Sequence, residues 1–414
     1  MRFKFLLSFL FFTSFIGVAQ QTTSSPYSFY GIGEVRFKGT VENRLMGGLS
    51  ILPDSIHVNI QNPASYSYLK LTTFSVGGAF NSGNLRTVTE KEKTQRSTLD
   101  YLAVAIPLTN AGFCFGLIPY SAVGYRIRNI DEANGLIQKF EGTGGMNKVF
   151  LGYGMQLKPN LSIGAELNYN FGEIQTSSLK YIDGIQYGSY EQNVTALSGF
   201  NYKIGLMYQR KLADLNLYTG LHYNYNSNLN TINDNTVSSV AYSEILTPTI
   251  IDVLSQNRNT GRLSMPNQMS LGAGIGKSRK WMIGTELTWN QSKATGNRYD
   301  DITVATFENG YKYSLGGFWI PNYNTFSNYF EKITYRAGFR YENTGLVIQN
   351  QTIKDYAVSA GFGLPLGGTF SNLNMGVEYG RKGTTQANLV QENYTNVVMS
   401  LSLNDKWFVK RKYD

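Results

Sequence analysis

Leu161-Ser-Ile-Gly-Ala-Glu-Leu-Asn-Tyr-Asn-Phe171 alternates between apolar and polar side chains without a break. Its polar positions are Ser162, Gly164, Glu166, Asn168 and Asn170. Because successive side chains of a β-strand point to opposite faces, the segment has one apolar and one polar face. It is as long as the roughly 9–11 residues that a tilted strand needs to cross a bilayer. The stretch therefore predicts a membrane strand with lipid outside and a polar lumen inside.

The same alternation returns at 215–225, 281–289, 333–341, 373–379 and 397–403. Reading all such runs predicts an all-β, 14-stranded antiparallel transmembrane β-barrel, and an even strand number is usual for bacterial outer-membrane proteins. The expected strands are 69–80, 97–108, 111–128, 145–156, 161–176, 196–210, 215–230, 264–276, 281–291, 309–318, 332–342, 355–364, 373–381 and 392–404.

The composition agrees with a wall that faces lipid. Charged residues are only 16 % of the chain, against a usual quarter, and aromatic residues are 14 %. Beyond the N-terminus no apolar run reaches the roughly 18 residues of a helical span. A closed barrel is then the structure that satisfies every backbone polar group in the bilayer.

The N-terminus indicates export. A basic start is followed by an apolar run over 5–16, and Gly17-Val-Ala19 offers a signal-peptidase site, so we expect residues 1–19 to be a signal peptide. The alternative, a membrane anchor, is disfavoured because the run is shorter than a span of roughly 20 residues. The net charge of +9 suits outer-membrane lipid and lipopolysaccharide as partners and gives no indication of nucleic acid.

The connections between strands predict the orientation. Short connections at 109–110, 157–160, 211–214 and 277–280 alternate with long polar ones at 81–96, 129–144, 177–195, 231–263 and 292–308. Outer-membrane barrels have short periplasmic turns and long external loops. We therefore expect a cell outer-membrane protein with both termini in the periplasm.

Residues 20–68 do not have the pattern of a barrel wall. They contain aromatic, Gly and Pro signals, including Met46-Gly47-Gly48 and Asn62-Pro63-Ala64, and are too apolar for a free tail. We expect them to form a hatch in or under the barrel of residues 69–404; a small periplasmic cap is the alternative. The end, 405–414, is a basic stub that contacts lipid head groups or a partner, or is simply solvated.

These features resemble the long-chain fatty-acid transporter family of outer-membrane proteins, the FadL-like and aromatic-hydrocarbon porin type. The resemblance rests on Met46-Gly47-Gly48, Asn62-Pro63-Ala64, the 14 strands and Tyr335-Arg-Ala-Gly-Phe-Arg-Tyr-Glu342. It implies a monomeric barrel with an N-terminal hatch that passes hydrophobic ligands sideways into the membrane through a break in the third strand.

The third expected strand contains Pro119 between Gly116 and Gly124. Proline removes a donor from the strand ladder and belongs at bulges or edges. We therefore predict a kink at Pro119 and, by the resemblance, a candidate lateral opening; the alternative is a bulge without a transport role.

Five strands place an ionisable residue two positions after a glycine that faces the same way. These residues are Glu166, His222, Glu286, Arg340 and Glu378. With Arg336 they predict a polar layer across the lumen, in which Arg336 and Arg340 neutralise the carboxylates. The layer either fills the interior and holds the hatch, or offers an arginine to the carboxylate of a ligand. A mixed-sign layer favours a plugged lumen over a wide aqueous pore.

The residue types in the sequence disfavour an enzyme. Only His57 and His222 are available as imidazole bases, and Cys114 is the single cysteine, so we expect no enzyme activity, cofactor or metal site. The first hypothesis is a FadL-like channel for passive uptake of small hydrophobic molecules such as fatty acids. The alternative is a non-transporting barrel subunit of an outer-membrane secretion or assembly complex, in which the apolar residues of 231–263 dock another outer-membrane protein.

Overall fold

The computed structural model describes residues 23–131, 133–182, 184–226, 228–243, 246–295, 305–324, 328–367 and 370–407. The expected signal peptide, residues 1–19, and residues 408–414 of the expected basic stub lie outside this part of the chain.

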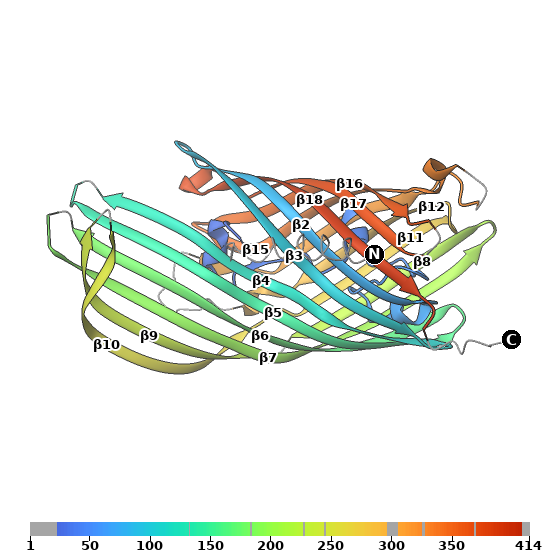
Figure 1. Ribbon diagram of the computed structural model, residues 1–414, viewed down its shortest axis with the longest axis horizontal. Coiled ribbons are helices and arrows are strands. Elements are labelled where there is room, and N and C mark those ends of the chain that lie inside the picture. The colour runs from blue at the N-terminus through green and yellow to red at the C-terminus, as the bar shows by residue number, and fades with distance from the viewer. Residues whose placement is uncertain are drawn as a thin grey trace, which may run out of the picture.

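The described strands form a closed antiparallel barrel of 14 strands (Figure 1). The wall consists of β2 (Thr72–Arg86), β3 (Lys91–Pro107), β4 (Ala111–Asp131), β5 (Leu136–Lys158), β6 (Leu161–Ile182), β7 (Tyr187–Leu212), β8 (Leu215–Asn226), β9 (Asn228–Ser243), β10 (Leu246–Ser264), β11 (Gln268–Lys277), β12 (Trp281–Asn290), β14 (Gly310–Trp319), β15 (Thr334–Ile348), β16 (Gln351–Pro365), β17 (Asn372–Lys382) and β18 (Gln391–Asp405). Pairing of β18 with β2 closes the ring. Consecutive β8 and β9 act as one wall strand, as do β10 and β11, because β7 pairs with β8 and then with β9.

Short segments complete the chain. They are β1 (Glu34–Val35), β13 (Ala305–Phe307), α2 (Val41–Leu45) and the 3-10 helices Pro26–Phe29, Pro63–Tyr68, Ser292–Ala294, Tyr329–Lys332 and Gln386–Asn388. Within the described residues no helix is long and apolar enough to cross a membrane.

The strand predictions are confirmed in order and number, but the long loops predicted at 81–96, 129–144, 177–195 and 231–263 are wrong. Residues 231–263 form most of the β9–β10 hairpin, and 129–144 and 177–195 are also largely strand. Beyond the lipid neither face of a strand needs to be apolar, so alternation disappears from the sequence while the backbone ladder continues. In Figure 1, β4 to β7, β9 and β10 extend to the left past the other strands as an open trough.

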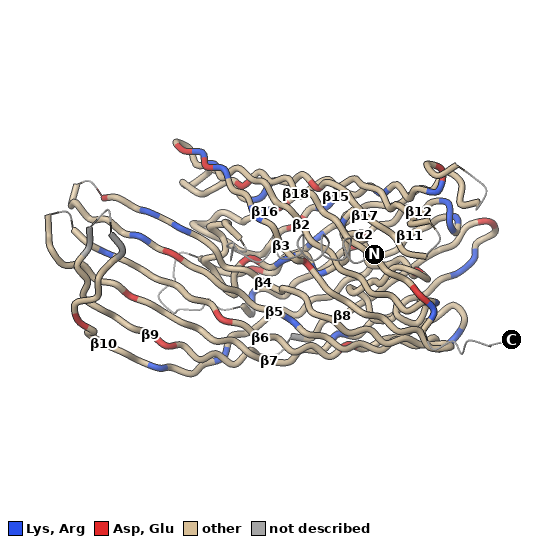
Figure 2. Tube along the Cα trace, in the orientation of Figure 1, with Lys and Arg blue, Asp and Glu red and all other residues tan. Residues whose placement is uncertain are grey.

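The wall has the two faces that alternation predicts. In β6, Leu167 and Tyr169 are exposed on the outside, whereas Glu166, Asn168 and Asn170 are buried. Charged residues gather at strand ends, such as the β2–β3 hairpin tip, and around α2 inside the barrel (Figure 2). The outer surface is therefore suited to lipid and the interior is polar.

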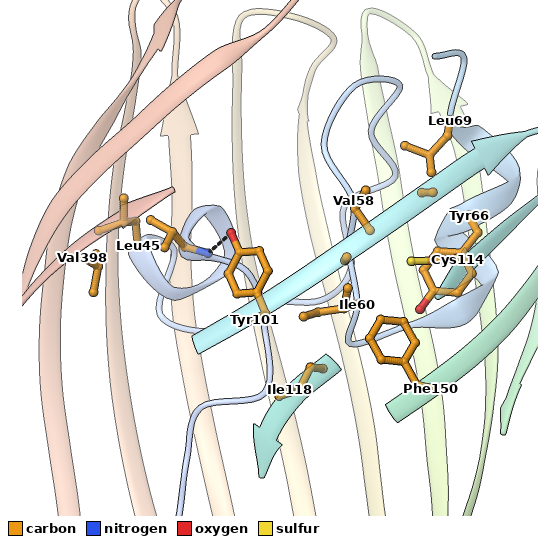
Figure 3. Packing of buried hydrophobic residues seen from close by; sticks show 13 residues of the cluster. Leu45, Val58, Ile60, Tyr66, Leu69, Tyr101, Cys114, Ile118, Phe150 and Val398 are labelled. Atoms are coloured by element: carbon orange, nitrogen blue, oxygen red, sulfur yellow. Dashed lines mark hydrogen bonds between the residues drawn. The ribbon is translucent and has the colours of Figure 1, made fainter. Parts of the chain in front are cut away.

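The N-terminal segment, residues 23–71, lies against the inner face of this wall. Figure 3 shows Leu45, Ile60 and Tyr66 from the segment beside the wall residues Tyr101, Cys114 and Phe150. The Tyr101 hydroxyl accepts a hydrogen bond of 3.3 Å from the Val41 backbone N–H. Helix α2 packs on β15 to β18, and the 3-10 helix Pro63–Tyr68 packs on β4 to β7.

The glycines of the five-strand pattern explain how the segment fits. A Cβ at Gly164 would lie 2.4 Å from the Pro63 carbonyl carbon, and one at Gly338 would lie 2.0 Å from the Gly47 nitrogen. Gly220 and Gly284 face Ile51 in the same way, and Gly376 faces Leu45. At each of these five positions the wall omits a side chain because the N-terminal segment occupies the space.

We expect Gly47→Ala to loosen the N-terminal segment. Gly47 has φ +71°, and an added Cβ would lie 2.6 Å from the Phe339 carbonyl oxygen and 2.8 Å from that of Leu315. Left-handed strain alone costs about 1 kcal/mol, and the clash with two backbone atoms adds to it. Urea unfolding in lipid bilayers measures the loss. The control is Gly184→Ala, with φ +81° and no atom within 4 Å of an added Cβ; equal losses in both variants would contradict close packing at Gly47.

Candidate functional site

The ladder between β3 and β4 stops halfway. Pairing runs from Pro107↔Gly112 to Leu102↔Leu117 and no further, although β3 continues back to Lys91 and β4 on to Asp131. The two strands diverge toward the trough in Figure 1. On its other side β4 keeps its partner β5, with a register shift between Pro119 and Ser121. The irregularity at Pro119 thus lies directly beyond the last β3–β4 pair.

The three residues that the sequence singled out here have different roles. Pro119 lies at the shift in register. Gly116 allows β3 to approach, since a Cβ there would lie 2.2 Å from the Leu102 carbonyl oxygen. Gly124 makes room for the N-terminal segment, because its Cβ would lie 2.0 Å from the Thr23 carbonyl oxygen.

Strand β1 of the N-terminal segment takes the place that β3 leaves on β4. Glu34 pairs with Ala122 and Val35 with Ser121. The Arg36 backbone N–H donates to the Tyr120 carbonyl oxygen at 3.0 Å, and the Ser121 hydroxyl donates to the Ile32 carbonyl oxygen at 2.7 Å. A two-residue strand therefore caps part of the exposed β4 edge.

Glu34 connects β1 to two strands of the barrel and to the start of the N-terminal segment. Its carboxylate lies 3.0 Å from Lys382 Nζ on β17 and 3.8 Å from Arg96 Nη2 on β3, and it accepts a hydrogen bond from the Thr23 hydroxyl. Burial opposes its charge, but Lys382 and Arg96 outweigh that effect and hold the pKa of Glu34 well below its usual range. The β3–β4 gap is spanned by β1, which pairs with β4 and contacts β3 through Glu34 and Arg96, in place of a direct backbone ladder.

Two cavities flank this bridge. The central chamber, about 260 Å³, combines cationic Lys38, Lys312 and Arg340 with an apolar part formed by residues such as Tyr30, Phe307, Leu346 and Ile353. The side chamber, about 120 Å³, lies against the inner faces of β2 and β3. Both are lined by Glu34, Val35, Arg36 and Phe37, so this stretch separates them.

The predicted polar layer is buried except for Arg340, which is partly buried, and most of the layer holds the N-terminal segment. Glu166 accepts from the Tyr66 hydroxyl at 2.8 Å. Glu286 accepts from the Ser50 hydroxyl at 2.6 Å, and His222 Nδ1 lies 3.3 Å from the same hydroxyl. Glu378 lies 2.9 Å from Arg44 Nη2.

The predicted partners of Glu166 are wrong. The sequence reading assigned Arg336 and Arg340 to the carboxylates, but Glu166 lies 2.7 Å from Lys203 Nζ and 3.6 Å from Lys148 Nζ. Both lysines occupy inward positions on the two strands next to β6. These partners could have been identified if the neighbouring strands and their register had been known.

The two arginines have separate surroundings. Arg336 is buried and donates to Asn374 Oδ1 at 2.9 Å. Arg340 lies 3.2 Å from Asp355, 3.4 Å from Glu342 and 3.9 Å from Glu378. Of the two, Arg340 lines both chambers.

The two sequence motifs of the N-terminal segment dock at different places. Asn62 accepts from the Ala64 backbone N–H at 3.1 Å and donates to the Leu206 and Leu221 carbonyl oxygens at 3.3 Å, which fixes Pro63 against β6. Met46, Gly47 and Gly48 lie at β14 and β15, where wall glycines Gly316 and Gly338 face Met46 and Gly47.

His57 gives the N-terminal segment a dependence on pH. Burial opposes its charge, but the Asp54 carboxylate, 2.9 Å from Nδ1, outweighs burial and raises the pKa of His57; Glu42 also raises it and Arg336 lowers it. The pKa of Asp54 is held at about 2, with burial opposed chiefly by His57. A group whose pKa is raised on folding stabilises the folded state at pH values below its unfolded-state pKa, which is about 6.5 for histidine. This stabilisation is lost as the pH rises through the folded-state pKa.

We therefore expect a contribution to stability that is larger near about pH 6 than near about pH 9. Urea unfolding of wild type and His57→Gln at both values measures it. The difference between the two proteins is expected to be larger at the lower pH; a difference independent of pH would contradict the pairing.

Within the described residues no cluster of side chains is suited to a metal ion.

No curated protein matches the sequence. Solved structures do match in fold. The P. putida toluene transporter TodX has 14 % identity and a TM-score of 0.61, covering 90 % of this chain and 100 % of its own. A Pseudomonas aeruginosa FadL homologue has 13 % identity and a TM-score of 0.58, covering 90 % and 98 %.

The CymD monoaromatic hydrocarbon channel has 13 % identity and a TM-score of 0.58, covering 92 % of this chain and 99 % of its own. These likenesses confirm the fold that the sequence resemblance implied. A family model described as BamG matches residues 1–414, the whole sequence. The chain therefore belongs to the BamG family and has the barrel fold of the FadL-type outer-membrane channels.

Proposed function

We propose that the protein is an outer-membrane channel for small hydrophobic molecules with an acidic head, such as fatty acids, and that it releases them sideways between β3 and β4. The observation that carries the proposal is the interrupted β3–β4 ladder, whose open part is occupied by β1 and bridged by Glu34. The fold shared with aromatic-hydrocarbon channels supports it.

The central chamber has the chemistry of a site for such a molecule. Its cationic part, with Lys38 and Lys312, suits a carboxylate, and its apolar part suits the beginning of an alkyl chain. The chamber volume of about 260 Å³ is small for a whole fatty acid, so the rest of the chain must extend past the stretch 34–37. Movement of that stretch joins the central chamber to the side chamber and to the gap.

In this mechanism the N-terminal segment is the hatch, and only part of it moves. Residues 40–71 are tied to the wall by the polar layer and by close contacts with glycines. β1 has only two paired residues on β4 and a few ionic contacts. Because β1 has fewer contacts, displacing it costs less free energy than displacing residues 40–71. We place the trough outside the cell and the short turns in the periplasm.

Binding of laurate tests the chamber. We expect Lys312→Gln to weaken laurate binding about tenfold, or about 1.4 kcal/mol, because a charged hydrogen bond is lost. Calorimetry on the full chain in detergent measures it, and binding of uncharged dodecanol should change little. The control is Lys354→Gln, an exposed lysine on β16 outside the chamber. Equal binding of laurate by wild type and Lys312→Gln would exclude this site.

A second function is favoured by β10. Between Leu246 and Ser264 it pairs only with β9 among the described strands, so its other edge has no strand partner in the described part of the chain. The edge strand carries exposed Ile250, Ile251, Val253 and Leu254. An exposed apolar edge strand normally needs cover. This supports a non-transporting subunit of an outer-membrane secretion or assembly complex, docked through β10.

A gentle detergent pull-down with mass spectrometry of proteins and lipids separates the two functions. Stoichiometric protein partners that are lost on Ile251→Asp and Val253→Asp substitution, with no co-purified fatty acid, would establish the subunit function and overturn the channel. A protein that purifies alone with bound fatty acid would support the channel.

A further inference from the structure

The trough contains a third cavity that neither proposed function uses. Its volume is about 700 Å³, within the usual range of about 300–1,000 Å³ for ligand sites. It is lined by the inner faces of β6, β7, β9 and β10, with Phe29, Tyr125, Phe140 and Leu263 as the apolar part. It is larger than the central and side chambers.

Five asparagine side chains and one threonine side chain form two rows across the wall of this cavity. Strand register aligns Asn193, Asn235 and Asn257 on β7, β9 and β10, and Thr195, Asn233 and Asn259 two residues away along each strand. Neighbouring strands are about 4.8 Å apart and alternate residues about 6.7 Å apart, so the rows form a regular grid of donors and acceptors.

Hydrogen bonds hold part of this grid in place. Asn235 Nδ2 donates to Glu191 Oε1 at 2.7 Å and to Asn193 Oδ1 at 2.9 Å. Asn233 Nδ2 donates to Asn193 Oδ1 at 3.2 Å, and the Thr195 hydroxyl donates to Asn233 Oδ1 at 2.9 Å. Ser178 Oγ, also in the lining, is buried and has no hydrogen-bond partner among the described residues. The grid is preorganised, and the exposed Asn257 and Asn259 side chains at its edge offer further polar groups to a ligand.

The charges and the aromatic rings define the ligand class. Glu191, Lys180 and Arg262 are the charged groups in the lining, so the cavity is nearly neutral, unlike the cationic central chamber. Phe29 and Tyr125 meet edge to face with ring centroids 5.3 Å apart, which gives an apolar surface at one side of the grid. A ligand that matches has many hydroxyls, no net charge and an apolar face.

We infer that the trough cavity binds a neutral oligosaccharide. Sugar hydroxyls both donate and accept, as do Asn side chains, and the C–H face of a pyranose suits the aromatic surface. The same chemistry is offered by a free glycan and by the carbohydrate part of lipopolysaccharide.

Calorimetry on the full chain tests the inference in a sugar-free detergent, since glycoside detergents would compete. The probes are maltohexaose, chitohexaose, mannohexaose and a delipidated, neutral oligosaccharide from the O-antigen of lipopolysaccharide. We expect at least one to bind with Kd at or below about 1 mM, and Asn193→Ala with Asn235→Ala to raise that Kd at least about tenfold. Asn257→Ala with Asn259→Ala, on the edge strand, is a second variant expected to weaken binding. Asn230→Ala, on the exposed face of β9, is the matched control.

The outcomes are distinct. Binding of a hexaose assigns a free glycan, and binding of the O-antigen oligosaccharide alone assigns lipopolysaccharide; both support the inference. Failure of all four probes at about 10 mM, or binding unchanged in both double variants, overturns it. A third outcome is that a synthetic peptide with the sequence of residues 228–243 binds and none of the saccharides does. This result also overturns the inference, in favour of strand addition at β10.

Discussion

A disulfide between β1 and β4 is expected to stop uptake of laurate, and its reduction to restore uptake. The substitutions are Val35→Cys and Ser121→Cys, made with Cys114→Ser to remove the buried native thiol. Val35 and Ser121 are directly opposite. Since Arg36 N–H bonds to the Tyr120 carbonyl next to them, they form the non-hydrogen-bonded kind of pair, with Cα atoms about 4.5 Å apart, within reach of a disulfide.

The physical reason is that a covalent bond removes the one motion that the lateral route requires. Uptake is measured with labelled laurate in cells whose outer membrane contains lipopolysaccharide, before and after a membrane-permeant reductant. Each single-cysteine variant is a control for the substitution itself. Uptake in the oxidised double variant equal to that after reduction would show that β1 does not gate the route.

The wall could be predicted from the sequence because the bilayer imposes a pattern on it. Leu167 and Tyr169 face lipid and are apolar, whereas Asn168 faces the lumen and is polar, so alternation located β6 and its two faces. Outside the lipid no such constraint acts, and the β9–β10 hairpin could not be distinguished from a loop. Its ladder rests on backbone hydrogen bonds, which leave no signature in residues such as Asn233 and Asn235.

The interior was predictable in part. The glycine pattern at Gly164 and Gly338 was visible, but its cause, close contact with Pro63 and Gly47, needed the fold. β1 left no signal because a two-residue strand depends on the β4 edge that receives it. The bond between Arg44 and Glu378 joins positions 334 residues apart, which spacing along the chain cannot reveal.

Glu166 is expected to be the most costly residue of the polar layer to neutralise. Its side chain is fully buried and receives Lys203, Lys148 and the Tyr66 hydroxyl. Glu166→Gln leaves two buried lysines without their carboxylate, and loss of one partner from a buried ion pair costs about 3–5 kcal/mol. Urea unfolding in lipid bilayers measures the loss, and hydrogen exchange of residues 60–68 reports whether the N-terminal segment loosens with it.

Two further variants distinguish an ion-pair effect from a general effect of charge. Asp234→Asn breaks the exposed pair with Arg258, at 3.6 Å, and should cost less than about 1 kcal/mol. Adding Lys203→Met to Glu166→Gln removes one of the two uncompensated lysines and should recover part of the stability. The contrary result is a double variant that is less stable than Glu166→Gln alone. Lys203 would then stabilise the N-terminal segment chiefly through its 3.1 Å hydrogen bond to the Ile60 carbonyl oxygen. In that case the Glu166 carboxylate is not the centre of the layer.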